Sequence, residues 1–279
     1  MRHAASLSDQ KAKSLRYRGA GVSRDYTIPL SLLKLGALVN LYFLAHTPAP
    51  FAPGVDSYLV LPAQTFFVVS LYRCLFPVRY EHNVVFHDSI FSSIFATRLL
   101  ATIAEIAYIY QFSHVLRLLN VEQDGWVNGL SWLMVAAATI SQEFVWAGIL
   151  TGRLELYFVE ELGWLLIFTA NTAAAAYLYL TTDAHGGRQA LLVTSLVFGA
   201  AYLPFQLLLL RGLRAAAIGR GTAPARRLAE GLKQSIRLKN RRTDAAAWGG
   251  WVGLLWMTGY WATLIPAWMY CNVVVLSAR

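Results

Sequence analysis

Five ionisable side chains within long apolar stretches are the residues best suited to do chemistry. They are Arg98, Glu105, Glu143, Glu160 and Glu161. A charged side chain inside a membrane span costs about 2.5–3.5 kcal/mol on insertion scales, so it normally faces a partner within the protein. Several carboxyl groups around a single guanidinium leave excess negative charge, which favours protonation of one carboxyl. Such a group suits general acid–base chemistry or the passage of protons and cations.

Helical spacing indicates which of these side chains can meet. Arg98 and Glu105 share one face of a helix but lie two turns apart, about 10 Å along the axis, so we expect each to pair elsewhere. The tight connection around residues 151–153 places Glu143 at a similar depth to the pair that begins at Glu160. We therefore expect the carboxylates and Arg98 to converge in one pocket, with Glu143 or Glu160 as acid or base.

Neighbouring positions on the same faces predict how the pocket binds a substrate. A guanidinium can hold an anionic headgroup, and aromatic rings can line the apolar part of a pocket. The residues predicted to bind the substrate are Arg98, Trp146, Tyr157, Trp164 and Asn171. A lipid or isoprenoid-like substrate fits this combination of charge and rings.

These residues belong to a chain whose composition is typical of a membrane protein. It is 57% hydrophobic and only 14% charged, against about 25% charged in soluble domains. Seven apolar segments each approach or exceed the roughly 20 residues that a transmembrane helix needs. We predict an all-α, seven-helix transmembrane bundle in residues 28–279, preceded by a basic tail in 1–27. The predicted spans are 28–46, 57–77, 91–116, 126–150, 156–180, 189–211 and 247–276.

The distribution of positive charge predicts the orientation of this bundle. Of the 24 lysines and arginines, 19 fall on one side when the seven spans are threaded in order. The positive-inside rule then predicts a cytoplasmic N-terminus and a C-terminus on the opposite side. The basic residues cluster at the ends of the predicted spans. We therefore interpret the net charge of +9 as the sum of topology determinants and contacts to anionic lipids. We expect no nucleic-acid partner.

The long connection 212–245 has a pattern of its own. Leu228, Leu232 and Ile236 are spaced four apart among basic residues. This pattern predicts an amphipathic helix on the cytoplasmic leaflet, where residues 226–242 contact anionic lipids.

A loop between the second and third spans contains the one spacing that suggests a metal. His82 and His87, followed by Asp88, form an H-x4-H pattern, which makes them weak candidates for a one-metal site. Membrane di-iron desaturases need several such histidine boxes, and the six histidines here are otherwise isolated, so that family is excluded. The last span contains no lysine, which excludes a retinal protein. No cofactor is predicted.

Two other classes of function remain open, and the sequence does not decide whether the protein is an enzyme. A proton- or cation-coupled transporter would use the same carboxylates and extend a wet path through Gln64, Gln142, Asn171 and Gln206. A structural subunit of a larger membrane complex would use small residues such as those in 172–176 for close helix packing.

Overall fold

Seven helices long and apolar enough to cross a membrane dominate the computed structural model, which describes residues 24–220 and 226–277. They confirm the prediction of an all-helical, multi-pass integral membrane protein. Most of the predicted tail 1–27 lies outside the described residues. The first six helices are α2 (Thr27–His46), α3 (Ser57–Leu75), α4 (Ile94–Leu119), α5 (Gly125–Thr151), α6 (Leu154–Thr181) and α7 (Gly187–Arg220).

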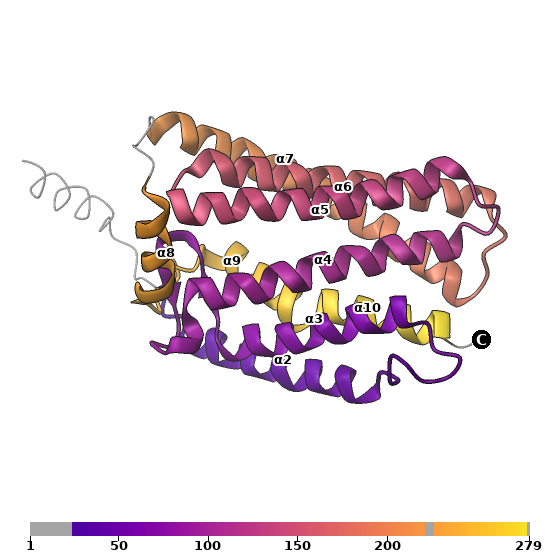
Figure 1. Cartoon of the computed structure of the whole chain (residues 1–279), viewed down its shortest axis with the longest axis horizontal. Helices are drawn as coiled ribbons and strands as arrows, with labels where there is room; N and C mark the ends of the chain where they lie inside the picture. The colour runs from indigo at the N-terminus through magenta and orange to yellow at the C-terminus, as the bar shows by residue number, and fades with distance from the viewer. Residues whose placement is uncertain (1–23, 221–225, 278–279) are drawn as a thin grey trace, which may run out of the picture.

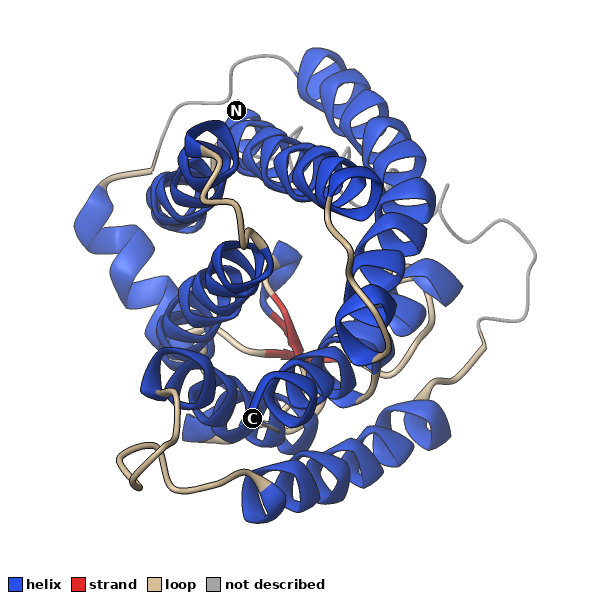
Figure 2. Ribbon diagram, turned by 90° about the vertical axis from the view of Figure 1, so that its right-hand side faces the viewer, coloured by secondary structure: helices blue, strands red, loops and turns tan. Residues whose placement is uncertain are grey.

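Consecutive helices pack side by side from α2 to α7, and the final helix packs against α2, α3, α4 and α7. The long helices run along the longest axis of the molecule (Figure 1). Viewed along that axis, they form a closed ring of helices (Figure 2). The described chain begins at the end that carries α8 (Leu228–Arg237), whereas the C-terminus lies at the opposite end (Figure 1).

Helix α4 starts three residues later than the predicted span 91–116. Residues Ile90–Ser92 form a short 3-10 turn instead, and the Ser93 side chain accepts a hydrogen bond from the Ala96 backbone N–H at 3.2 Å. Serine is a preferred N-cap because its oxygen satisfies one of the free N–H groups of the first turn. The cap fixes the start of the helix that carries Arg98.

The seventh span is interrupted, whereas the sequence predicted one continuous helix over 247–276. A π-helical segment, Thr258–Ala262, separates two α-helices, and Thr263 leaves helical geometry with φ −137° and ψ −74°. The two parts are α9 (Gly250–Met257) and α10 (Leu264–Ser277).

Pro266 explains the position of this break. A proline has no N–H to donate, and its ring clashes with the carbonyl four residues earlier, here Ala262. Polar backbone groups at membrane depth need partners inside the protein. Asn40 donates from its Nδ2 to the Trp261 carbonyl at 2.9 Å, and Cys74 approaches the same oxygen with its Sγ at 3.5 Å. Helices α2 and α3 therefore stabilise the broken span.

Helix α8 and three two-residue strands cover one end of the bundle. Strand β2 (Val84–Val85) pairs antiparallel with β1 (Val78–Arg79) and parallel with β3 (Asn240–Arg241), joining the loop after α3 to the segment after α8. Helix α8 packs against α4 and α5. A Cβ on Gly231 would lie 1.8 Å from the Leu150 carbonyl oxygen, so this close approach requires glycine.

Candidate functional site

A cavity of about 680 Å³ lies inside the bundle, near the end covered by α8 and the strands. It is lined mainly by α4, α6, α7 and the broken seventh span, together with β1, Arg73 of α3 and Val145 of α5. Aromatic rings form much of its wall. The charged residues that line it are Arg73, Arg79, Arg98, Glu105, Glu160 and Glu161.

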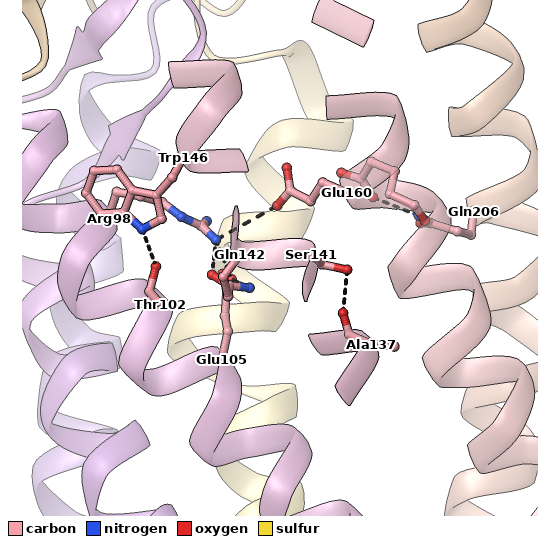
Figure 3. A network of polar contacts seen from close by, with 10 residues as sticks. Arg98, Thr102, Glu105, Ala137, Ser141, Gln142, Trp146, Glu160 and Gln206 are labelled. Atoms are coloured by element: carbon pink, nitrogen blue, oxygen red, sulfur yellow. Dashed lines mark hydrogen bonds and ion pairs between the residues drawn. The ribbon is translucent and has the colours of Figure 1, made fainter. Parts of the chain in front are cut away.

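Arg98 is the centre of a buried polar network in this wall (Figure 3). Its Nη2 donates to Glu105 Oε2 at 2.9 Å and to Gln142 Oε1, and lies 3.9 Å from Glu160 Oε1. Gln142 Nε2 also donates to Glu105 Oε2, at 3.1 Å. Arg98 is only 2% exposed, and two carboxylates compensate its charge.

The expectation that Arg98 and Glu105 are too far apart to pair was wrong. It considered only the rise of the helix, about 10 Å over seven residues. Both side chains are long, and they extend toward each other along the same helical face until their charged atoms meet.

Glu160 and Glu161 both line the cavity, as the sequence predicted, but they have different partners. Glu160 faces Arg98, whereas Glu161 Oε2 accepts a hydrogen bond from Gln206 Nε2 at 2.7 Å. Gln206 also donates to the Glu161 backbone carbonyl at 2.8 Å. This double contact ties α7 to α6 beside the cavity.

Glu143 does not join this cluster, contrary to the prediction. The structure places it on the exposed face of α5, outside the cavity lining. Its neighbour Gln142 is 1% exposed and takes the inward position. One residue turns a helix by about 100°, so Gln142 and Glu143 point to different sides of α5, and Gln142 is the one that faces the network.

Two of the predicted substrate-binding residues besides Arg98 line the cavity, and two do not. Tyr157 and Trp164 line it. Trp146 instead donates from its Nε1 to Thr102 Oγ1 at 3.0 Å, outside the lining. Asn171 is buried against a separate void of only about 10 Å³.

Sequence reasoning missed two further arginines of the lining, Arg73 and Arg79. Both lie near a membrane end, where a basic residue is normally a topology determinant. With Arg98 they bring the lining to three arginines and three carboxylates, so the expected excess of negative charge is absent from it. The tyrosines Tyr108, Tyr202 and Tyr260 were also missed, because aromatic residues are frequent in every span.

A layer of packed rings lies on the side of the cavity away from the charged end. Phe168 packs on Phe198 with ring centroids 4.9 Å apart, and Phe198 packs on Trp268 at 5.2 Å. Trp268 in turn contacts Phe112 at 4.3 Å. The rings come from α4, α6, α7 and α10. Phe168 and Phe198 line the cavity, whereas Phe112 and Trp268 line the small void beside Asn171, so the layer lies between the two.

The cavity reaches the outer surface between α7 and α9. Of its lining residues, Leu255 on α9 is 68% exposed and Val252 is 58% exposed, and Ala201 on α7 is also exposed. Trp256 is 44% exposed and stacks on Phe205 of α7 with ring centroids 6.3 Å apart. The exposure of these lining residues indicates that the cavity opens on the side of the bundle, between α7 and α9.

The weak metal candidates do not converge. His82 is exposed and has a positive φ of 59°, Asp88 lies 3.6 Å from Lys239 Nζ, and His87 packs edge-on against the Phe86 ring. The described residues contain no group of three His, Cys, Asp or Glu side chains that could hold a metal ion.

The cavity therefore combines a charged end, aromatic walls, a layer of packed rings on its inner side and exposed lining residues between α7 and α9. No protein-family model, curated protein or solved structure matches this chain.

Proposed function

We propose that the protein binds a lipid or isoprenoid-like molecule within the membrane, as a binding protein or as an enzyme acting on it. The cavity that is charged at one end, aromatic elsewhere and open sideways carries this proposal. Its volume of about 680 Å³ lies within the range of roughly 300–1,000 Å³ that is usual for ligand sites. An amphipathic molecule entering from the bilayer would match both parts of the lining.

Glu160 is the group best placed for proton transfer if the bound molecule reacts. It lines the cavity, is 8% exposed, and has Arg98 3.9 Å from its Oε1. A carboxyl group positioned within reach of a bound molecule can act as general acid or base. Arg98 acts as a positioning residue in this proposal, because Glu105 and Gln142 already hold its guanidinium.

Coupled transport receives less support from the same geometry. Of the residues expected to extend a wet path, Gln142 and Gln206 belong to the charged end, and Asn171 lies beyond the aromatic layer. Gln64 donates from its Nε2 to the Pro48 carbonyl at 3.0 Å and belongs to neither cavity. A transport path would have to cross the packed rings, whereas a binding site needs only the lateral opening.

A purely structural role also receives less support. The small residues of 172–176 are largely used inside the molecule, since Ala174 and Ala175 are fully buried. A Cβ on Gly199 would lie 2.0 Å from Thr172 Oγ1, which shows how closely α7 already packs on α6. Most of this segment therefore packs within the chain, and only Ala173 is exposed for contact with a partner.

The orientation and the lipid contact of 226–242 form part of the same proposal. The end that carries α8 would face the cytoplasm, because most of the described basic residues belong to segments at that end. Leu228, Leu232 and Ile236 are exposed on α8 beside exposed Lys233 and Arg237, a pattern suited to the surface of an anionic membrane.

Filling the cavity tests the proposed function. Gly259 lines it, and a Cβ there would meet nothing within 4 Å, so Gly259→Phe places a ring in open space. Gly129 on α5 is exposed, lies outside the cavity and has equally free surroundings, which makes Gly129→Phe the matched control. The assay is saturable binding of tritiated hexadecanol and hexadecyl phosphate to purified protein.

We expect wild type and Gly129→Phe to bind at least one of the two probes with a stoichiometry near one. Gly259→Phe should weaken that binding at least tenfold, because its ring takes the space of the alkyl chain. Absence of saturable binding of either probe to wild type, or equal binding by Gly259→Phe, would refute the proposed function.

A further inference from the structure

Arg73 is a buried cation in the cavity wall that has no anionic partner among the described residues. It lies in the last turn of α3, lines the cavity and is 6% exposed. Its Nη2 donates to the Val78 carbonyl at 3.3 Å, while its Nε and Nη1 have no hydrogen-bond partner. In the part of the chain that the structure describes, no carboxylate lies within ion-pair distance of this guanidinium.

Aromatic rings stabilise Arg73 without satisfying its N–H groups. Its guanidinium carbon lies 5.3 Å from the centroid of the Tyr80 ring and 5.1 Å from that of Trp261. Such cation–π contacts cover the faces of the guanidinium, whereas its five donors point outward in its own plane. A buried charge with unused donors is costly, and an anion held in the same plane would remove that cost.

Arg98, in the same cavity wall, differs from Arg73 because it already has anionic partners. It was the residue predicted to hold an anionic headgroup, but Glu105 and Glu160 already compensate its charge. A ligand anion beside it would face two carboxylates. Arg73 therefore fits that role better, and Arg79, which lines the same end of the cavity, adds a second positive charge there.

We infer that Arg73 binds the phosphate or carboxylate group of an amphipathic ligand whose apolar part lies along the aromatic wall. This inference rests on the proposed function and names the chemical class of its ligand. The planar guanidinium offers parallel N–H groups that match the oxygens of a phosphate or carboxylate. From that anchor the apolar part would extend past Tyr202 and Phe205 toward the lateral opening beside Trp256.

The test compares three probes on wild type and two variants. Hexadecyl phosphate and hexadecanol differ only in the anionic group, and inorganic phosphate supplies the anion without the chain. Arg73→Gln removes the proposed anchor. Arg117→Gln is the control, because Arg117 is also an arginine against aromatic rings, 4.3 Å from the Trp132 centroid, but lies outside the cavity.

We expect wild type and Arg117→Gln to bind hexadecyl phosphate at least tenfold more tightly than hexadecanol. Arg73→Gln should abolish this difference while it leaves the affinity for hexadecanol unchanged. Arg73→Lys should retain part of the preference, since it keeps the charge but loses the planar fork. The comparison of the two probes on wild type needs no variant, so a poorly folded Arg73→Gln does not prevent the test.

Each contrary result has a distinct meaning. Equal affinity of wild type for the two long-chain probes would overturn the role of Arg73 and leave the proposed function intact. Inorganic phosphate binding as tightly as hexadecyl phosphate would assign the site to a free anion and overturn the amphipathic ligand. Failure of both long-chain probes to bind wild type would refute the proposed function itself.

Discussion

Removing Glu105 should destabilise the bundle strongly, because it breaks the closest ion pair of the buried network. Glu105 accepts hydrogen bonds from Arg98 at 2.9 Å and from Gln142 at 3.1 Å. Breaking a buried ion pair by removing one partner costs about 3–5 kcal/mol. Glu160, already 3.9 Å from Arg98, retains part of the compensation, so we expect Glu105→Leu to cost about 3 kcal/mol, at the lower end of this range.

A double-mutant cycle measures this coupling directly. The four proteins are wild type, Glu105→Leu, Arg98→Met and the double variant, unfolded at equilibrium in mixed micelles of dodecylmaltoside and dodecyl sulfate. We expect the double variant to lose about 2 kcal/mol less than the sum of the single variants, because each single variant leaves the other member of the Arg98–Glu105 pair buried without its partner, whereas the double variant removes both members.

An exposed ion pair supplies the control for this cycle. Arg153 Nε lies only 2.6 Å from Glu155 Oε1, yet both side chains are about half exposed, at 49% and 48%. Water screens such a pair, so its cycle should show no measurable coupling. The reasoning would be refuted if the stability loss of the Arg98 and Glu105 double variant equals the sum of the two single losses within about 0.5 kcal/mol, because independent sites are additive within that margin.

Two further predictions concern the end of the bundle that carries α8. Gly231→Leu should release α8 from α5, because even its Cβ would lie 1.8 Å from the Leu150 carbonyl oxygen, and faster proteolysis within 226–237 would show this. Burial, followed by the charges of Lys34 and Arg241, lowers the pKa of His87 below its usual value. Because its neutral form is favoured in the folded state, its stabilising contribution is present above pH ~6.5 and is lost as pH falls toward the lowered pKa. The melting temperature of wild type should therefore fall more between pH 7 and 5 than that of His87→Asn; equal slopes would contradict this.

The seven spans could be predicted because length and hydropathy are properties of each segment alone. The break in the last span could not, although Pro266 marks its position. A proline is tolerated in a membrane helix when neighbouring groups satisfy the freed backbone. Here that depends on Asn40 and Cys74, which approach from two other helices and cannot be placed by a local pattern.

The candidate site was predicted in part, for reasons that particular residues make clear. Glu160 and Glu161 could be assigned to the interior of the bundle, because an ionisable side chain within an apolar span normally faces the interior and not the lipid. Whether Gln142 or Glu143 faces the interior depends on how α5 is rotated about its own axis. The two side chains differ by about 100° around the helix, and the order of polar residues in the sequence does not determine this rotation. Arg73 was missed because an arginine near the end of a span is normally explained by the orientation of the protein in the membrane.

The central claim is that the cavity holds an amphipathic molecule, and a cryo-electron microscopy structure in lipid nanodiscs tests it most directly. An antibody fragment bound to the protein would make a chain of 31.0 kDa large enough to align. We predict elongated density from the Arg73 guanidinium to the opening beside Trp256, ending at the ring layer of Phe168 and Trp268. A cavity filled by side chains, or a water-lined path that crosses this layer, would contradict the account.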